Sequence, residues 1–261
     1  MKQAFAKAQI EAEITSRFGA VFKLGEKYPA HFLSSGVAEI DTLTGGGLPR
    51  GAITEIFGVA SSGRISLLVS GLAYATSNNE TCVLVDTSDT FDPASAANAR
   101  VDFDRLLWVR CGHSVERAFK ATDLLLQSGG FGLVALNLAD VATKYMRQII
   151  SSWWFRFRRV IESTPTALVV VTPAACVRSC AAVVLEMKNE GAVWPGTRTT
   201  EHSTNKSPQL SLVTDSVRQV KHQSVLLTSS QLLCRIDVRV NREKPAFWID
   251  GPARFSPHSC S

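Results

Sequence analysis

The sequence lacks the features that mark membrane proteins and metal-binding proteins. No apolar run reaches the roughly 18 residues that a membrane span needs, and the N-terminal stretch has no signal-peptide core. The six cysteines are scattered, and neither they nor the five histidines are spaced as metal ligands. We therefore expect a cytoplasmic protein with no membrane contact, no metal centre, no catalytic triad and reduced, buried thiols.

Charge of either sign is also scarce, and this limits what can be said about partners. The chain has 261 residues, of which 45% are hydrophobic and 20% charged, with a formal net charge of +5. This composition suits one compact domain with an ample core, or one domain with small appendages. The basic excess mildly favours an acidic partner such as DNA, but it is too small to establish one.

Short apolar segments alternate with helical patterns along most of the chain. We expect strands at residues 52–57, 82–86, 106–109, 133–136 and 167–171, and helices at 64–76, 114–128 and 143–162. This alternation predicts an α/β fold with a mainly parallel, twisted sheet covered by helices on both faces. Two later strands, 181–187 and 232–240, have no helix between them, so we expect a late antiparallel extension of the sheet.

Four regions follow from this pattern. Residues 1–33 are predicted to form an amphipathic helix and a linker, and residues 34–194 to form the core. Residues 195–224 are polar and are interpreted as a flexible insertion. Residues 225–261 are expected to add the final strands of the core and a C-terminal tail.

A loop after the first predicted core strand has the layout of a phosphate-binding loop. That pattern is Gly, four residues, Gly, Lys and then Ser or Thr, placed between a strand and a helix. Here Arg64 stands at the Lys position and Ile65 at the hydroxyl position, while Ser66 offers a hydroxyl one position late. Isoleucine cannot coordinate a metal ion. The degenerate loop comprises Gly58, Ser61, Ser62, Gly63, Arg64, Ile65 and Ser66.

Four blocks of sequence resemble the core of the bacterial RecA recombinases. They are the run from Ser34 to Gly51, the loop with Glu55-Ile56-Phe57 before it, Val85-Asp86 with Phe91-Asp92-Pro93, and Gly191-Ala192-Val193 with Arg239-Val240 and Lys244. The resemblance implies a RecA-like P-loop core. We expect no counterpart of the large C-terminal domain of RecA, and the segments that would correspond to its flexible DNA-contacting loops are short.

The departures from the RecA pattern concern one reaction. RecA proteins place a water-orienting glutamate where this chain has Ser88, and a metal-supporting aspartate where it has Asn137. Together with Arg64 and Ile65, these are four changes against ATP hydrolysis, which depends on positioning and charge stabilisation. We therefore expect no enzyme activity and no cofactor, with ATP binding without hydrolysis left open.

A narrower resemblance is to the ImuA-like proteins, RecA-related accessory factors of the SOS mutagenesis cassette. It rests on Ser61-Ser62-Gly63-Arg64 with Leu67-Leu68, on residues 106–111, on Gly129-Gly130-Phe131-Gly132-Leu133 and on residues 154–159. The resemblance implies a non-catalytic role in translesion synthesis and induced mutagenesis. It also implies protein partners, namely an ImuB-like polymerase homologue, RecA and an error-prone polymerase assembly, with DNA contact indirect.

Two surfaces are candidates for binding partners. One is the helix segment with Trp154, Phe155, Arg158 and Arg159, where an outward aromatic side chain lies among arginines. Such a surface can bind a protein or stack on nucleobases, or it can be covered by another part of the chain. The other is the N-terminal helix face, which packs either on its own core or on a neighbouring RecA-like protomer, and it comprises Ile10, Ile14 and Phe18.

Two other functions remain open at this point. A divergent RecA-family, DNA-dependent ATPase in repair or recombination would use Arg64 and Ser66 for binding and a carboxylate not yet identified for catalysis. A SulA-like inhibitor of cell division is a third reading, because SulA-type proteins are related to the same degenerate lineage.

Overall fold

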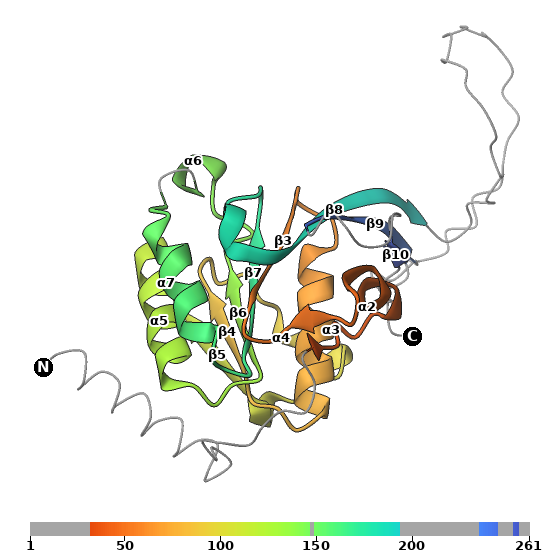
Figure 1. Cartoon of the computed structure of the whole chain (residues 1–261). Coiled ribbons are helices and arrows are strands. Elements are labelled where there is room, and N and C mark those ends of the chain that lie inside the picture. Colours follow the sequence, from red (N-terminus) through yellow and green to blue (C-terminus); the bar gives the residue numbers. More distant parts are fainter. Residues whose placement is uncertain (1–31, 147–148, 194–234, 245–252, 256–261) are drawn as a thin grey trace, which may run out of the picture.

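The computed structural model of the chain describes residues 32–146, 149–193, 235–244 and 253–255 (Figure 1). The predicted N-terminal helix, including Ile10, Ile14 and Phe18, lies outside the described residues, and so does the predicted insertion at 195–224. Within the described ranges, no helix is both long and apolar enough to cross a bilayer.

An eight-stranded sheet forms the centre of the protein, in the order β10-β9-β8-β3-β7-β6-β4-β5. The five neighbouring pairs from β8 to β5 are parallel, whereas β8–β9 and β9–β10 are antiparallel. The structure therefore confirms the expected α/β fold with its late antiparallel extension. The strands are β3 (Ile53–Gly58), β4 (Cys82–Asp86), β5 (Leu106–Arg110), β6 (Leu133–Asn137), β7 (Ala167–Thr172), β8 (Ala181–Val193), β9 (Arg235–Lys244) and β10 (Ala253–Phe255).

Helices cover both faces of this sheet. Figure 1 shows α5 and α7 together on one side and α3 on the other. A separate two-stranded pairing joins β1 (Phe32–Leu33) to β2 (Leu48–Pro49). The helices are α2 (Ala38–Thr44), α3 (Arg64–Ser77), α4 (Pro93–Asn98), α5 (Val115–Ser128), α6 (Thr143–Met146) and α7 (Ser152–Ile161), with the 3-10 turns η2 (Phe103–Arg105) and η3 (Arg178–Cys180).

The apolar strands supply two separate layers of core because successive side chains of a strand point to opposite faces. On β4, Cys82 and Leu84 join the layer with α3, while Val83 and Val85 join the layer with α5 and α7. The other central strands alternate in the same way. Burial on both faces explains why these strands are continuous apolar runs rather than alternating patterns.

The predicted long helix at 143–162 is wrong, because the structure divides it into α6 and α7. Between them, Ile149 is half-buried against the α5 side of the core, whereas Ile150 is 66% exposed. Two serines, Ser151 and Ser152, follow at the start of α7, where hydroxyl residues are tolerated better than in a helix interior. The apolar spacing across the segment is real, but it does not belong to one continuous helix.

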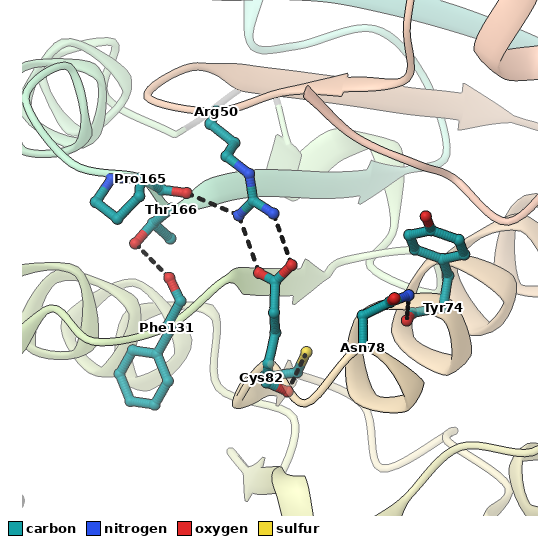
Figure 2. A network of polar contacts seen from close by, with 8 residues as sticks. Arg50, Tyr74, Asn78, Cys82, Phe131, Pro165 and Thr166 are labelled. Atoms are coloured by element: carbon teal, nitrogen blue, oxygen red, sulfur yellow. Dashed lines mark hydrogen bonds and ion pairs between the residues drawn. The ribbon is translucent and has the colours of Figure 1, made fainter. Parts of the chain in front are cut away.

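A buried ion pair lies where the chain enters three of the central strands. The Arg50 guanidinium donates to both carboxylate oxygens of Glu80, at 3.0 and 2.6 Å, and to the Pro165 carbonyl at 3.0 Å (Figure 2). The two side chains are only 8% and 11% exposed. Gly132 faces this pair, and a Cβ there would lie 1.8 Å from Oε2 of Glu80. The pair thus ties the segments before β3, β4 and β7 together.

Candidate functional site

The degenerate loop lies between the end of β3 and the start of α3, as the sequence predicts. Two of its residues adopt left-handed backbone conformations, Ser61 with φ of 58° and Gly63 with φ of 87°. The Ser62 amide donates to the Val59 carbonyl at 3.3 Å, which closes a turn inside the loop. The strand–loop–helix arrangement of a phosphate-binding loop is therefore present.

Both glycines of the loop are also required by packing. A Cβ on Gly58 would lie 2.4 Å from the Met187 carbonyl oxygen, and a Cβ on Gly63 would lie 2.8 Å from Cγ2 of Val238. In addition, the Asn189 amide donates to the Ser61 carbonyl at 3.1 Å. These contacts come from β8 and β9, so the antiparallel extension packs directly on the loop. The glycines have a structural reason to be present that involves no nucleotide.

Arg64, at the position of the phosphate-binding lysine, is directed into the protein. It is 5% exposed, and its Nη1 donates to the Thr172 carbonyl at 2.7 Å and to the Ala139 carbonyl at 3.3 Å. Burial lowers the pKa of the guanidinium, and the nearby charge of Asp140 acts in the opposite direction. Since arginine stays ionised even so, Arg64 is an internal cation that joins the ends of β6 and β7.

The residues after Arg64 face a different space. Ile65 and Ser66 line a groove of about 830 Å³ between α3 and the start of α4, together with Asp92 and Ser95. Asp92 is the N-cap of α4, and hydrogen bonds from the Ser95 hydroxyl and then from the Ser95 and Ala94 amides lower its pKa. The groove therefore brings the Ser66 hydroxyl and the Asp92 carboxylate to one space.

The two positions that carry carboxylates in RecA are occupied by neutral side chains with different surroundings. The Asn137 amide donates to Oδ1 of Asp86 at 3.3 Å, and its oxygen accepts from the Ala139 amide at 3.1 Å. Oδ2 of Asp86 accepts from the Phe91 amide at 2.9 Å, so Asp86 shapes the turn after β4. Ser88 lies on the other side of that turn and lines a second groove.

Glu55 is a buried carboxylate that the sequence analysis did not single out. It is fully buried on β3, and its Oε1 accepts from the amides of Cys176 and Val177, at 2.6 and 3.1 Å, and from the Thr172 hydroxyl at 3.3 Å. Desolvation nevertheless raises its pKa, because it outweighs these hydrogen bonds. The carboxylate holds the short connection between β7 and η3 against the end of the sheet.

The α7 candidates separate into one core residue and three surface residues. Trp154 is 2% exposed and packs edge-on against Phe119 at 5.0 Å between ring centroids, so it is not a surface contact. The structure contradicts the prediction for Trp154, because Phe119 of α5 covers its ring. Phe155 is 55% exposed, and Arg158 and Arg159 are exposed beside it.

The second groove is a feature that the sequence analysis missed. It has a volume of about 800 Å³ and opens between the start of α5 and the segment from α6 to α7, with Ser88 at one side. Tyr145 and Ile150, 50% and 66% exposed, lie along it with the half-buried Trp153. The unbroken helix predicted for 143–162 left no place for this groove, because the groove lies at the break that separates α6 from α7.

The residues of the loop region do not fit a magnesium nucleotide. Such a ligand needs a hydroxyl at position 65 and carboxylates at the ends of the strands, and a cationic side chain free to reach phosphate. Here position 65 is apolar, and the Asn137 amide is hydrogen-bonded to Asp86. The Arg64 guanidinium donates hydrogen bonds to two backbone carbonyls instead of pointing out of the loop. Within the described ranges, no three His, Cys, Asp or Glu side chains gather as metal ligands.

Comparison with known proteins gives consistent matches. The family model for the RecA N-terminal domain matches residues 3–147. Among curated proteins, the chain is similar to protein RecA of Rickettsia canadensis (strain McKiel), with 34% identity over 139 residues, 52% of this chain and 40% of that protein. It is also similar to protein RecA of Pseudomonas putida (35% over 139 residues, 52% and 39%) and of Mannheimia haemolytica (35% over 143 residues, 54% and 38%). The matches thus span about two fifths of the length of these relatives.

Proposed function

Since the chain belongs to the RecA family, we propose that it is a non-catalytic member that acts as an adaptor in the response to DNA damage. The observation that carries the proposal is the placement of Arg64. Its guanidinium is buried and bonded to the Thr172 and Ala139 carbonyls, so the loop presents no free cation to a nucleotide. The neutral side chains at Ser88 and Asn137 support the same conclusion, because they remove the groups that orient water and support a metal ion.

The contacts of the connection after β7 support an adaptor rather than a recombinase. In RecA, a flexible segment at this place faces DNA. Here the connection is short, and two of its amides, those of Cys176 and Val177, are bonded to the buried carboxylate of Glu55. A segment held in this way has little freedom to rearrange around a DNA strand.

The process that we propose is SOS mutagenesis by translesion synthesis, in the manner of the ImuA-like proteins. The support is the combination of a retained RecA core with a lost nucleotide site, together with the exposed aromatic and basic residues on α7. The partners would be an ImuB-like polymerase homologue, RecA and an error-prone polymerase.

One observation favours the alternative of a divergent ATPase. The groove beside the loop places Ser66 and Asp92 within one space of about 830 Å³, which is large enough for a ligand of nucleotide size. Such an enzyme would still need a route past Arg64 and a carboxylate to position water.

Nucleotide assays decide between these two functions. We expect no ATP turnover above background by the full chain with Mg²⁺, with or without single-stranded DNA. DNA-stimulated hydrolysis that is lost on substitution of Arg64 or Ser88 would overturn the adaptor function. Calorimetric titration with Mg²⁺ and ATP provides the second measurement, because absence of binding excludes the divergent ATPase. The double substitution Arg64→Lys/Ile65→Thr restores the loop pattern and is the control for whether the fold still accepts a nucleotide.

The cellular role is tested separately. Deleting the gene should lower the frequency of mutations induced by a DNA-damaging agent. The frequency of homologous recombination should stay unchanged. Complementation with the intact gene should restore that frequency. Affinity capture of the tagged chain from damaged cells should recover polymerase components, whereas recovery of division proteins would favour the SulA-like function.

A further inference from the structure

One face of α7 combines an exposed aromatic ring with cations whose guanidinium groups have no partner among the described residues. Phe155, Arg158 and Arg159 are separated by three and four positions, so they lie next to each other on the helix surface. The third arginine of this helix, Arg156, pairs with Asp123 at 2.5 Å. Neither the Arg158 guanidinium nor the Arg159 guanidinium forms an ion pair or hydrogen bond with a described residue. We call Phe155, Arg158 and Arg159, with the cleft described next, the α7 surface.

A small cleft continues this surface beyond the end of the helix. It has a volume of about 250 Å³, and Arg158 forms one side of it. Lys244, at the end of β9, forms the other side, and its ammonium donates to the Ser179 carbonyl at 3.1 Å and to the Ala181 carbonyl. No described carboxylate pairs with Lys244. Glu162 is the one acidic residue among those lining the cleft, and the remaining lining residues are small, namely Gly51, Ala52, Ser179, Cys180, Ala181 and Ala182.

Gly51, one of the residues that line the cleft, has a fixed backbone, so the cleft is a defined part of the fold rather than a gap at a helix end. Gly51 has φ of 69°, and its amide donates to the Thr166 carbonyl at 2.8 Å. A Cβ there would lie 3.2 to 3.4 Å from the carbonyl oxygens of Thr164, Glu162 and Ile161. The chain before β3 therefore packs closely on the end of α7 and the residues that follow it.

We propose that the α7 surface binds an acidic peptide segment of a partner protein. An apolar side chain of the segment covers the Phe155 ring, and its carboxylates pair with Arg158, Arg159 and Lys244. Charge complementarity carries this choice, because three cations face solvent or the cleft with one carboxylate among them. Aromatic and arginine side chains are also the residues that most often dominate the energy of protein interfaces.

A protein segment fits this surface better than a nucleic acid strand. Single-stranded nucleic acid is bound by a basic groove with a series of aromatic side chains on which successive bases stack. The α7 surface offers one ring, and the other exposed aromatic residues of the described ranges lie on different elements.

This inference rests on the proposed function, since an adaptor needs a docking surface. The test uses the full chain as bait for a library of random displayed peptides. The triple variant Phe155→Ala/Arg158→Glu/Arg159→Glu is used for counter-selection. We expect enriched peptides to carry several Asp or Glu residues around an aromatic or aliphatic one. Enrichment of neutral or basic peptides, or no enrichment over the triple variant, would overturn the proposal.

Separate substitutions of the aromatic and the basic residues then locate the binding site of the peptide. A synthetic enriched peptide should bind roughly tenfold or more weakly to Phe155→Ala and to Arg158→Glu/Arg159→Glu, as expected for central interface residues. Tyr145→Ala and Arg100→Glu/Lys120→Glu are the matched controls, with an equally exposed ring and the same net charge change, and they should change the affinity less than twofold. Thermal melts of all variants establish that they are folded.

A labelled oligothymidine is titrated into the same variants. If the wild-type chain bound the oligothymidine and the α7 substitutions abolished that binding, the proposal of a peptide ligand would be overturned in favour of nucleic acid. The result is independent of the nucleotide assays. ATP turnover would contradict the adaptor function without affecting peptide binding, and failure of peptide binding would leave the loss of the nucleotide site intact.

Discussion

The Arg64 guanidinium donates a hydrogen bond to the carbonyl oxygen of Thr172 over 2.7 Å and thereby joins the start of α3 to the end of β7. Replacing Arg64 by Ala leaves this carbonyl and that of Ala139 without their donor in a buried place. Each buried acceptor left without a donor destabilises the folded state by about 1–3 kcal/mol. We therefore expect the free energy of unfolding to fall by about 2–4 kcal/mol. Urea denaturation followed by circular dichroism measures it.

The control for this substitution is Arg117→Ala. Arg117 also donates to a backbone carbonyl, that of Gly112 at 3.2 Å, but it is exposed. Water can replace its donor, so its removal should change stability by no more than about 0.5 kcal/mol. Equal losses at the two sites would show that Arg64 is not a structural cation.

The buried Arg50–Glu80 pair predicts a second, larger effect. Substituting Glu80 by Gln leaves the guanidinium without its counter-charge, and breaking a buried pair by removing one partner costs about 3–5 kcal/mol. The double variant Arg50→Met/Glu80→Leu removes both charges and should recover part of the loss. The exposed pair Arg110–Asp89, at 3.2 Å, is the matched control, and Asp89→Asn should cost less than about 1 kcal/mol. Calorimetric unfolding of the variants checks the ranking.

The packing role of the loop glycines can be tested at Gly63 by measuring stability, without any nucleotide. Its φ is 87°, and an added Cβ would lie 2.8 Å from Val238. Backbone strain and overpacking together should make Gly63→Ala destabilising by about 2–3 kcal/mol. Adding Val238→Ala should relieve the clash but not the strain. Gly191→Ala, where a Cβ would meet nothing within 4 Å, should change stability little. A harmless Gly63→Ala would contradict the packing role.

Glu55 predicts a pH dependence of stability. Because burial raises its pKa above the value of 4.5 in an unfolded chain, the folded state holds the proton more tightly than the unfolded state. Its contribution is therefore fully present below pH 4.5, and it is lost as the pH rises through the raised pKa. Glu55→Gln should match the wild type in acid and exceed it in stability at neutral pH, as measured by urea titrations across this range.

Glu116→Gln provides a control of opposite sign. The hydrogen bond from Lys120 lowers the pKa of Glu116, so this carboxylate contributes stability at neutral pH that is lost in acid. The variant should therefore be slightly less stable than the wild type at neutral pH and equal to it in acid. If both glutamine variants shifted in the same direction, burial of Glu55 would not be the cause.

Local pattern was sufficient to predict most of the framework. The strands β4, β6 and β7 are short apolar runs that hardly fit any other element, and Ser114 and Gly129 bound α5 at the expected places. The spacing of Gly58 and Gly63 was likewise enough to place a loop between a strand and a helix. Such features depend on neighbours in the sequence, and the sequence shows them directly.

Features that depend on distant parts of the chain were not predictable. Nothing near Arg64 in the sequence indicates that its partners are the Thr172 and Ala139 carbonyls. Trp154 and Phe155 are adjacent aromatic residues, and only the position of α5 decides that one is buried and the other exposed. The break before α7 also has no glycine or proline to mark it.

The contact between Val238 and Gly63 has a consequence for the order in which the protein is built during translation. The loop is made early, but β9, whose Val238 side chain packs on it, leaves the ribosome much later. Until then the backbone of the loop is uncovered on that side. The start of α3 therefore gains its final surroundings only after β9 has been synthesised.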